Sequence, residues 1–359
     1  MLGLGHSTKP SEAGVARVLI ALAALALGLL VIWLLHTELL LIFLAVLLAV
    51  SLRGATDRVA AHTPLNRRLA MTLIVVVIAA AVLGFCVWVG PRLVQQVTDL
   101  VNALIREGQD LASRYGHTQW GSQILDKIKG AGAQTAQSLA APMLTAATST
   151  FSGLLAIFVL IVTMIYFAAS PTLYLEGMVA LVPPARRPRL RAVLDKVGHV
   201  LRWWFLGQMI DMAVVGLFTM IGLSVIGMPM ALALGAIAGI LTFVPYFGAI
   251  LAAIPALAIA LGQGLHMAFL TLIVFTICHV IEGYIVSPLV QDRMVRLPPA
   301  LLILSMTLLG ALFGPMGIIL ATPLAAAGLV LVSELYVVDV LGDERGRDVA
   351  TRPPSKTEL

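Results

Sequence analysis

The chain of 359 residues is 60% hydrophobic and only 11% charged, with a formal net charge of +5, and its mean hydropathy is +1.01. Soluble domains contain less apolar and far more charged sequence, so this composition excludes an ordinary soluble protein. The apolar residues form uncharged runs of about twenty residues or more, which indicates membrane-spanning helices rather than barrel strands. We therefore expect an all-α integral membrane protein.

The first apolar stretch runs from Val18 to Leu52 and is interrupted only by the sequence HTE at residues 36–38. At about 1.5 Å per residue it is too long for one crossing, which favours a tight helical hairpin. Basic residues flank it on both sides, and those of the 53–68 loop predict a cytoplasmic location because short cytoplasmic loops collect Lys and Arg. A cleaved signal peptide is the alternative, although a second span follows at once.

The next two apolar runs, Leu69–Gly90 and Phe151–Ala169, are expected to cross outward and back. Residues 1–90 then hold three N-terminal spans, and residues 91–150 form an extracytoplasmic segment of different character. In that segment apolar residues recur at helical spacing between polar ones, as in an amphipathic helix. These residues are Val94, Val97, Val101 and Leu104. We interpret the segment as a helical lid; a partner-binding or membrane-surface module is the alternative.

Residues 151–202 combine the fourth span with the most basic stretch of the chain, PPARRPRLRAVLDKVGHVLR. Between two spans such a stretch is more often a cytoplasmic loop that orients the protein and meets anionic lipid than a nucleic-acid site. We therefore expect a lipid bilayer partner and no nucleic acid. Cys86 and Cys278 both lie within apolar runs and are read as small buried hydrophobes, with no metal site.

Residues 203–341 contain two long apolar segments, 228–261 and 297–332, that are interrupted midway by Pro and Gly in matching positions. The interrupting residues are Pro245 and Gly248 in the first and Pro315 and Gly317 in the second. Pro removes a helical hydrogen bond and Gly permits turns, so each centre is predicted to be a helix break. Inside a membrane a break is tolerated where the freed backbone faces protein or a water-filled cavity. Simple proline kinks in ordinary spans are the alternative.

The helix before each broken segment carries an acid at a corresponding position. Gln208 and Asp211 in QMID correspond to His279 and Glu282 in HVIE, and in each pair the two residues are three apart, on one helix face. Paired interrupted segments in two halves of a chain are a sequence pointer to the binding site of a transporter. Intramembrane carboxylates commonly mark ion or proton pathways, although each acid could also simply hold helices together.

The distribution of basic residues favours a layout in which each broken segment folds back as a re-entrant hairpin. The chain then returns to the cytoplasm before Arg293 and Arg296, and the tail 342–359 is also cytoplasmic. The two units of the transport core, residues 203–341, would have opposite orientations, which makes them an inverted repeat. In the competing layout each broken segment crosses once and places those two arginines outside.

Three stretches, VPYFGAILAAIPALAIAL, VIEGYIVSPLV and GALFGPMGIILATPLAA, in this order and spacing, resemble the AI-2E family of transporters, also called the autoinducer-2 exporter or PerM-like family. The resemblance extends from about Val18 to Leu341. It implies an all-α bacterial inner-membrane protein with about eight membrane segments and a homo-oligomeric assembly. It also implies export of an autoinducer-2-like solute or exchange of Na⁺ and H⁺. The chain departs from the usual pattern at Ala249, Gly283 and Asp292.

We therefore expect a secondary transporter that moves a small polar solute by alternating access, coupled to H⁺ or Na⁺, with both termini cytoplasmic. The candidate binding residues are Gln208, Asp211, Pro245, Gly248, His279, Glu282, Pro315 and Gly317. An enzyme is disfavoured because the sequence lacks an H-E-x-x-H metal helix and a G-x-S-x-G elbow, and the lack of a Walker A motif argues against an ATP-driven pump. No cofactor is expected. A Na⁺(Li⁺)/H⁺ antiporter and a non-transporting scaffold or regulator are the alternative functions.

Overall fold

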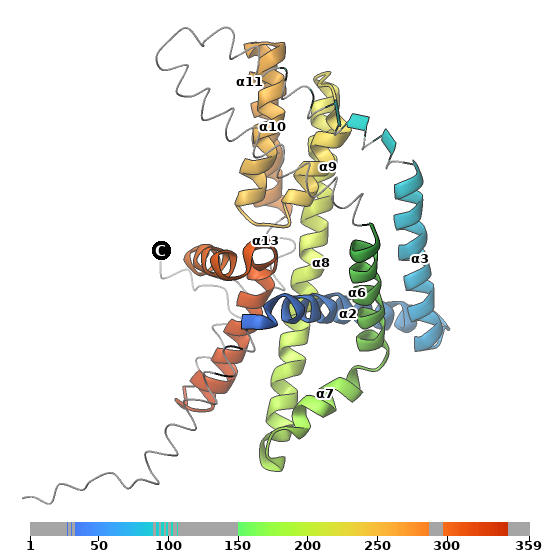
Figure 1. Cartoon of the computed structure of the whole chain (residues 1–359), viewed down its shortest axis with the longest axis vertical. Coiled ribbons are helices and arrows are strands. Elements are labelled where there is room, and N and C mark those ends of the chain that lie inside the picture. The colour runs from blue at the N-terminus through green and yellow to red at the C-terminus, as the bar shows by residue number, and fades with distance from the viewer. Residues whose placement is uncertain are drawn as a thin grey trace, which may run out of the picture.

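The computed structural model describes residues 33–88, 150–286 and 297–343, with isolated residues at 27 and 30 and between 91 and 106. All regular elements of these described ranges are helical, which confirms the all-α prediction (Figure 1). In chain order they are α2 (His36–His62), α3 (Arg67–Trp88), α6 (Thr150–Ala169), α7 (Pro171–Ala180), η1 (Pro184–Arg186), α8 (Arg187–Val225), α9 (Ala231–Leu241), α10 (Phe247–Gln263), α11 (Leu265–Ile281), η2 (Glu282–Val286), α13 (Pro299–Val332) and η3 (Ser333–Val338).

Four helical stretches among the described residues are long and apolar enough to cross a membrane. They are His36–His62, Pro184–Val225, Leu265–Val286 and Pro299–Val338. Helices α6 and α7, which are bent by 82° at a short break, make a fifth if they count as one broken span. The chain is therefore a multi-pass helical protein, and the expected total of about eight segments stays a prediction.

The helix that contains the first apolar stretch continues past the first charged residues. Helix α2 starts at His36, within the HTE sequence and just after a turn at Leu35, and continues as far as His62. The prediction of a loop over residues 53–68 was therefore wrong for most of that range. Basic residues mark the edge of an apolar environment without interrupting helical hydrogen bonds, and Arg and Ala are good helix formers. The preceding arm of the expected hairpin lies largely outside the described residues.

The basic stretch before the core is also helical rather than a loop. Helix α8 runs without interruption for 39 residues from Arg187 to Val225, with a proline in its first turn, where proline is tolerated. It forms a long rod through the molecule, and α2 crosses it at a steep angle (Figure 1). Charged and apolar parts of the sequence thus belong to one rigid element.

Helices α8 and α9 pack closely through a set of glycines. A Cβ atom on Gly239 would lie 2.8 Å from the carbonyl oxygen of Met212 and 3.0 Å from the Cα of Gly216. Gly235, four residues before Gly239, is similarly crowded, since its Cβ would lie 2.8 Å from the carbonyl oxygen of Gly216. Small residues spaced by four let membrane helices approach to backbone contact. The GAIAG sequence of α9 therefore fixes the first broken segment against α8.

The first broken segment is a helical hairpin. Helices α9 and α10 are joined by residues 242–246, and the side-chain amide of Gln263 at the end of α10 lies 3.6 Å from the sulfur of Met228, which precedes α9. In the turn, Tyr246 has a positive φ of 64°. The helix break predicted around Pro245 is therefore confirmed in the backbone.

The second broken segment interrupts α13 at Gly314, which has φ 66° and ψ −152°, a conformation that essentially only glycine adopts. The tip glycines of the two segments have matching environments. A Cβ on Gly248 would lie 2.1 Å from the carbonyl oxygen of Leu241, and one on Gly317 would lie 2.0 Å from that of Leu309. Both predicted breaks exist, and each needs a glycine where the backbone turns back on itself.

Replacing Gly314 by alanine is expected to destabilise the protein by about 1–3 kcal/mol, the usual cost of forcing a side chain into such a backbone region. Gly328 is a matched control in the second half of α13, because a Cβ there meets no atom within 4 Å. Gly328→Ala should be neutral or slightly stabilising, since alanine favours a helix. Thermal unfolding of both variants in a neutral detergent measures the difference. Equal melting temperatures would contradict the strained break.

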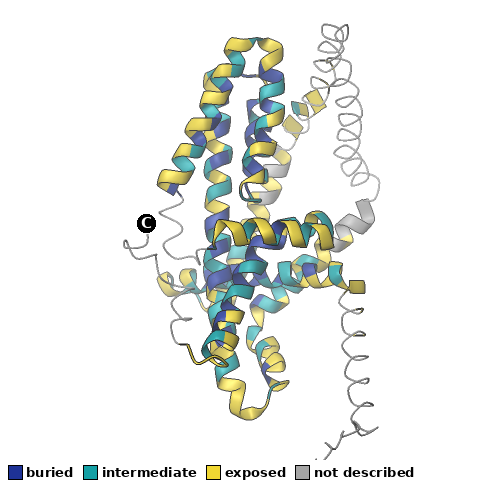
Figure 2. Ribbon diagram, turned by 90° about the vertical axis from the view of Figure 1, so that its left-hand side faces the viewer, coloured by how far each residue is buried: buried dark blue, intermediate teal, exposed yellow. Residues whose placement is uncertain are grey.

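The exposed residues lie on the outward faces of the helices, whereas the buried residues lie where helices meet (Figure 2). Large exposed side chains on α3 and α6 include Val76, Leu83, Ile157 and Phe158. Exposed apolar side chains of this size, repeated along several helices, match a hydrocarbon surrounding rather than water.

Most of the predicted lid, residues 91–150, lies outside the described residues. Among the described residues of this segment, the side-chain oxygen of Gln96 accepts a hydrogen bond from the backbone N–H of Ala233 at 3.0 Å.

Candidate functional site

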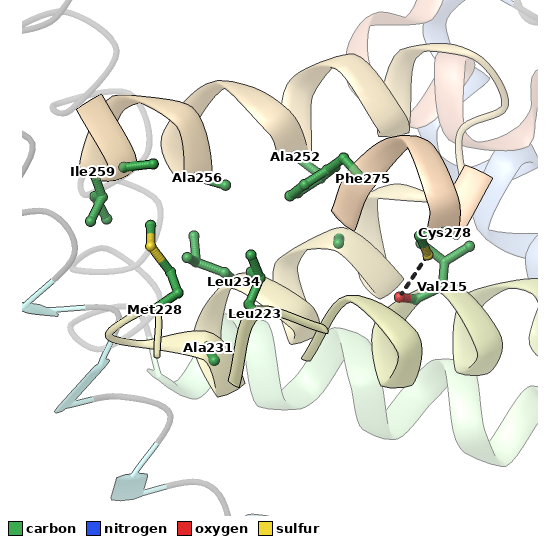
Figure 3. Packing of buried hydrophobic residues seen from close by; sticks show 12 residues of the cluster. Val215, Leu223, Met228, Ala231, Leu234, Ala252, Ala256, Ile259, Phe275 and Cys278 are labelled. Atoms are coloured by element: carbon green, nitrogen blue, oxygen red, sulfur yellow. Dashed lines mark hydrogen bonds between the residues drawn. The ribbon is translucent and has the colours of Figure 1, made fainter. Parts of the chain in front are cut away.

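Helices α8 and α11 pack in antiparallel directions, and this packing aligns their polar positions. The hydroxyl of Thr219 on α8 donates to the sulfur of Cys278 on α11 at 3.5 Å. The thiol of Cys278 donates to the carbonyl oxygen of Val215 on α8 at 3.7 Å (Figure 3). Both residues of α8 lie among the buried apolar side chains that join α8, α9, α10 and α11. Asp211 lies one helical turn before Val215 on α8. Glu282 lies one helical turn after Cys278, directly beyond the last residue of α11. The two predicted acids are thus on facing turns.

Asp211 and Glu282 lie close enough to interact electrostatically. One carboxylate oxygen of Asp211, Oδ1, is buried and has no hydrogen-bond partner among the described residues. Nδ1 of His279 lies 2.7 Å from Oε2 of Glu282, and the two form a hydrogen bond. Within the described ranges neither acid forms an ion pair with a lysine or arginine. The structure therefore brings the two predicted acids, one from α8 and one from the end of α11, into one neighbourhood.

Glu282 occupies the first position of η2, a π-helical turn that continues α11. The π-helical turn widens the helix and shifts the facing of the residues that follow, and such turns are common at functional sites. Its side chain is 27% exposed and that of His279 is 30% exposed. The acid pair is thus partly accessible from one side and buried on the side of Asp211.

Gln208 bonds to the backbone of the first broken segment. Its side chain is buried, and its Nε2 donates to the carbonyl oxygen of Thr242 at 2.9 Å. Thr242 is the C-cap of α9, at the start of the tip that contains Pro245. A backbone carbonyl freed by the helix break is therefore satisfied by a side chain one turn from Asp211. One face of α8 therefore carries Gln208, which contacts the first tip, and one turn later Asp211, which faces Glu282.

The second tip, with Pro315 and Gly317, lies against α2 rather than against the acids. The ring of His36 stacks on Phe313, with centroids 5.5 Å apart. Beside it is a cavity of about 400 Å³ lined by α2 and by both halves of α13. Phe43 of α2 lines this cavity and also packs against the buried cluster of Leu201 and Trp204, against which Phe243 of the first tip packs as well. Helix α2 therefore contacts the second tip and shares a buried cluster with the first, which the sequence did not predict.

The cavity offers little to a polar solute. Its lining is apolar except for His36 and Ser305, and both are already engaged: Nδ1 of His36 bonds the carbonyl oxygen of Trp33, and the Ser305 hydroxyl donates to that of Leu301. The acid pair, with an unsatisfied carboxylate oxygen, has the stronger demand for a cation or proton. We therefore take the acid pair as the chemical centre of the site.

A second charged cluster was missed by the sequence reasoning. Glu334, in the π-helical turn η3, is 2% exposed. Arg189 of α8 donates through Nη2 to its Oε2 at 2.8 Å, and Lys196 donates to its other oxygen. Arg189 also donates to Asp339 at 3.0 Å. The available signal was a lone acid within the apolar run LVSELYVV, similar to the isolated position of Glu282.

The fold and the site together define an all-α, multi-pass membrane protein with two broken helices and an intramembrane acid pair. The description "AI-2E family transporter" matches residues 22–336. The chain belongs to this family, as the sequence resemblance had predicted.

Proteins similar to this chain carry transport names. The chain is 27% identical over 280 residues to the transport protein YueF of Bacillus subtilis (strain 168), covering 73% of this chain and 76% of that protein. It is 33% identical over 152 residues to YrrI of the same organism, or 42% and 43% of the two chains. It is 29% identical over 150 residues to the AI-2 transport protein TqsA of Escherichia coli (strain K12), or 42% and 40%. A general transport function is thus supported.

Proposed function

We propose that the protein is a secondary transporter whose coupling site is the pair Asp211 and Glu282. The observation that carries the proposal is the position of this pair, one helical turn from Gln208, which bonds the tip carbonyl of Thr242. Because Asp211 and the contact to the first tip lie on one face of α8, a change in the charge of the acid pair can move that tip. Broken helices beside intramembrane acids are features of carriers that work by alternating access.

Two neighbouring carboxylates in a low-dielectric site repel each other, so both are not ionised without a cation between them. Uptake of a proton or Na⁺ removes the repulsion and lets the turns of α8 and η2 approach. Release of the cation restores the repulsion and favours separation. Because Gln208 holds the first tip to the same stretch of α8, a change in the spacing of the acids would be transmitted to that tip.

The transported solute is proposed to be small and polar, of the kind that the name of TqsA denotes, AI-2. Carbonyl groups freed at the first tip, around Pro245, together with the acids, would provide its hydrogen-bond partners. Gly248 and Gly317 would keep the two tips tightly folded, because each glycine leaves room for a carbonyl of the preceding helix. The proposal includes a bacterial inner-membrane location with both termini in the cytoplasm and a homo-oligomeric assembly.

A Na⁺(Li⁺)/H⁺ antiporter is the second candidate. It is favoured by the chemistry of the site, because the carboxylates of Asp211 and Glu282 and the imidazole of His279 suffice for cation and proton exchange. A scaffold without transport activity would leave the isolated acids unexplained.

A flux screen in proteoliposomes tests the proposal. The purified full-length protein is reconstituted and assayed with Na⁺, Li⁺, protons and an autoinducer-2-type diol, with and without an imposed pH gradient. We expect flux of at least one of these above empty liposomes, and acceleration by the gradient. Diol movement favours the first candidate, and cation movement alone favours the antiporter. An absence of flux with all four would favour the scaffold and refute the proposal.

A further inference from the structure

Where α2 crosses α8, two guanidinium groups lie over one indole ring. The Cζ of Arg58 is 4.7 Å from the ring centroid of Trp203, and the Cζ of Arg202 is 6.0 Å from it. The ring of His199 lies edge-on to the same indole, with centroids 6.3 Å apart. Two positive charges from different helices therefore lie against one indole ring, and this concentration of positive charge favours an anion nearby.

The described carboxylates do not supply that anion. Among ion pairs between described residues, neither Arg58 nor Arg202 takes part in one, and the neighbouring acid Asp57 is paired with Arg53 and Arg67 instead. The Nε of Arg202 is buried and has no hydrogen-bond partner in the described part of the chain. That nitrogen is covered by the packing of the two helices, whereas the Arg202 side chain as a whole is half-buried, so a ligand with acceptor oxygens would bond the terminal nitrogens of the guanidinium.

The side chain of Arg202 is held in place by the packing of the two helices. A Cβ atom on Gly54 would lie 2.2 Å from Cδ of Arg202 and 2.4 Å from its Nε, so the arginine passes directly over the backbone of α2. Because only glycine leaves this space, the guanidinium is positioned before any ligand arrives. A positioned guanidinium loses little side-chain freedom on binding, unlike a surface lysine.

The crossing also lies at a border between charged and apolar sequence on both helices. On α2 the apolar run ends at Leu52, directly before Arg53. On α8 the basic residues end at Arg202, and the rest of that helix contains no Lys or Arg. The contact between Gly54 and Arg202 brings these two borders together. Tryptophan is enriched at the depth where the lipid headgroups meet the hydrocarbon. The site is thus expected at headgroup level.

We propose that Arg58, Arg202 and Trp203 form a binding site for the phosphate of an anionic phospholipid. The forked donors of arginine match phosphate oxygens, and the indole packs against the glycerol region. The occupied site would join α2 to α8, and α2 contacts the second broken tip through His36 and Phe313. This site is separate from the acid pair, so its test does not depend on the proposed transport cycle.

The test is equilibrium binding of fluorescent phosphatidylglycerol to the purified full-length protein in neutral detergent. We expect Arg58→Gln and Arg202→Gln each to weaken binding about fivefold, as removal of one juxtamembrane cation does. Arg191→Gln is the matched control, because Arg191 belongs to the same basic stretch but pairs with the exposed Glu176 at 3.4 Å. The control should bind as the wild type does.

Two competitors separate the lipid from other occupants. Unlabelled phosphatidylglycerol should displace the probe, whereas phosphatidylcholine and inorganic phosphate should not at equal concentration. Wild-type affinity in both arginine variants would overturn the proposal, as would equal displacement by either competitor. Arg58 is exposed, so Arg58→Gln should fold normally and keeps the test decisive if Arg202→Gln does not.

Discussion

Replacing Glu282 by glutamine is expected to abolish pH-dependent transport while leaving folding and membrane insertion intact. The substitution keeps the size of the side chain and the hydrogen bond to His279, whose Nδ1 lies 2.7 Å from Oε2 of Glu282. It removes the negative charge that repels Asp211. If that charge couples the cycle, the transport rate should fall by about tenfold or more, equivalent to about 1.4 kcal/mol or more. The measurement is solute or cation flux in proteoliposomes at several pH values.

A matched control separates coupling from general damage. Glu176→Gln removes an acid whose side chain is 66% exposed and pairs only with Arg191 among the described residues. It should transport at the wild-type rate and keep the same pH profile. If Glu282→Gln instead kept both the rate and the pH profile of the wild type, the acid would have only a packing role.

Replacing Glu334 by glutamine is expected to lower the free energy of unfolding by about 3 kcal/mol. The side chain of Glu334 is 3% exposed, whereas those of Arg189 and Lys196 are 34% and 39% exposed. Breaking a buried ion pair usually costs about 3–5 kcal/mol, and partial solvation of the two cations places this case at the lower end. The loss is measured by denaturant unfolding in detergent micelles.

Asp339 is the control for this second prediction, since it also pairs with Arg189 but has a side chain that is 34% exposed. Asp339→Asn should cost less than about 1 kcal/mol, as exposed pairs do. The difference between the two variants then reports burial rather than charge alone. Similar small losses in both would contradict a structural role for the buried carboxylate.

The sequence identified the helix breaks because their causes are local. Pro245 and Pro315 remove backbone donors, and the glycines that follow them are needed where the chain turns back. It did not identify Gly314 as the residue that takes the unusual backbone conformation. The signal was its place directly before Pro315, where a residue is already driven away from helical geometry.

Pairing of distant residues was harder to anticipate. The spacing of Asp211 and Glu282 predicted that each acid lies on a polar helix face, and the antiparallel packing of α8 and α11 then placed the faces together. Gln208 was assigned to the same face correctly, but its bond to Thr242 depends on how far α9 extends. Such contacts are set by tertiary packing, which no local pattern encodes.

The positions of basic residues did not predict where the helices end. Basic residues over 53–62 and 187–202 were interpreted as loops, whereas α2 and α8 continue through them. The positive-inside bias reports the position of the bilayer edge, and a helix can extend well past that edge. The partners of Arg189 and Lys196 come from the end of α13, about 140 residues away, so the cluster at Glu334 has no local signature.

The claim that Asp211 and Glu282 form one coupling site is tested most directly by comparing the flux of three variants. These are Asp211→Asn, Glu282→Gln and the double substitution, reconstituted at equal density and assayed across a pH gradient. Residues that act as a unit are strongly non-additive, so we predict that the double variant transports no more slowly than the slower single variant. Losses that multiply in the double variant would mean that the acids act independently and would contradict the single site.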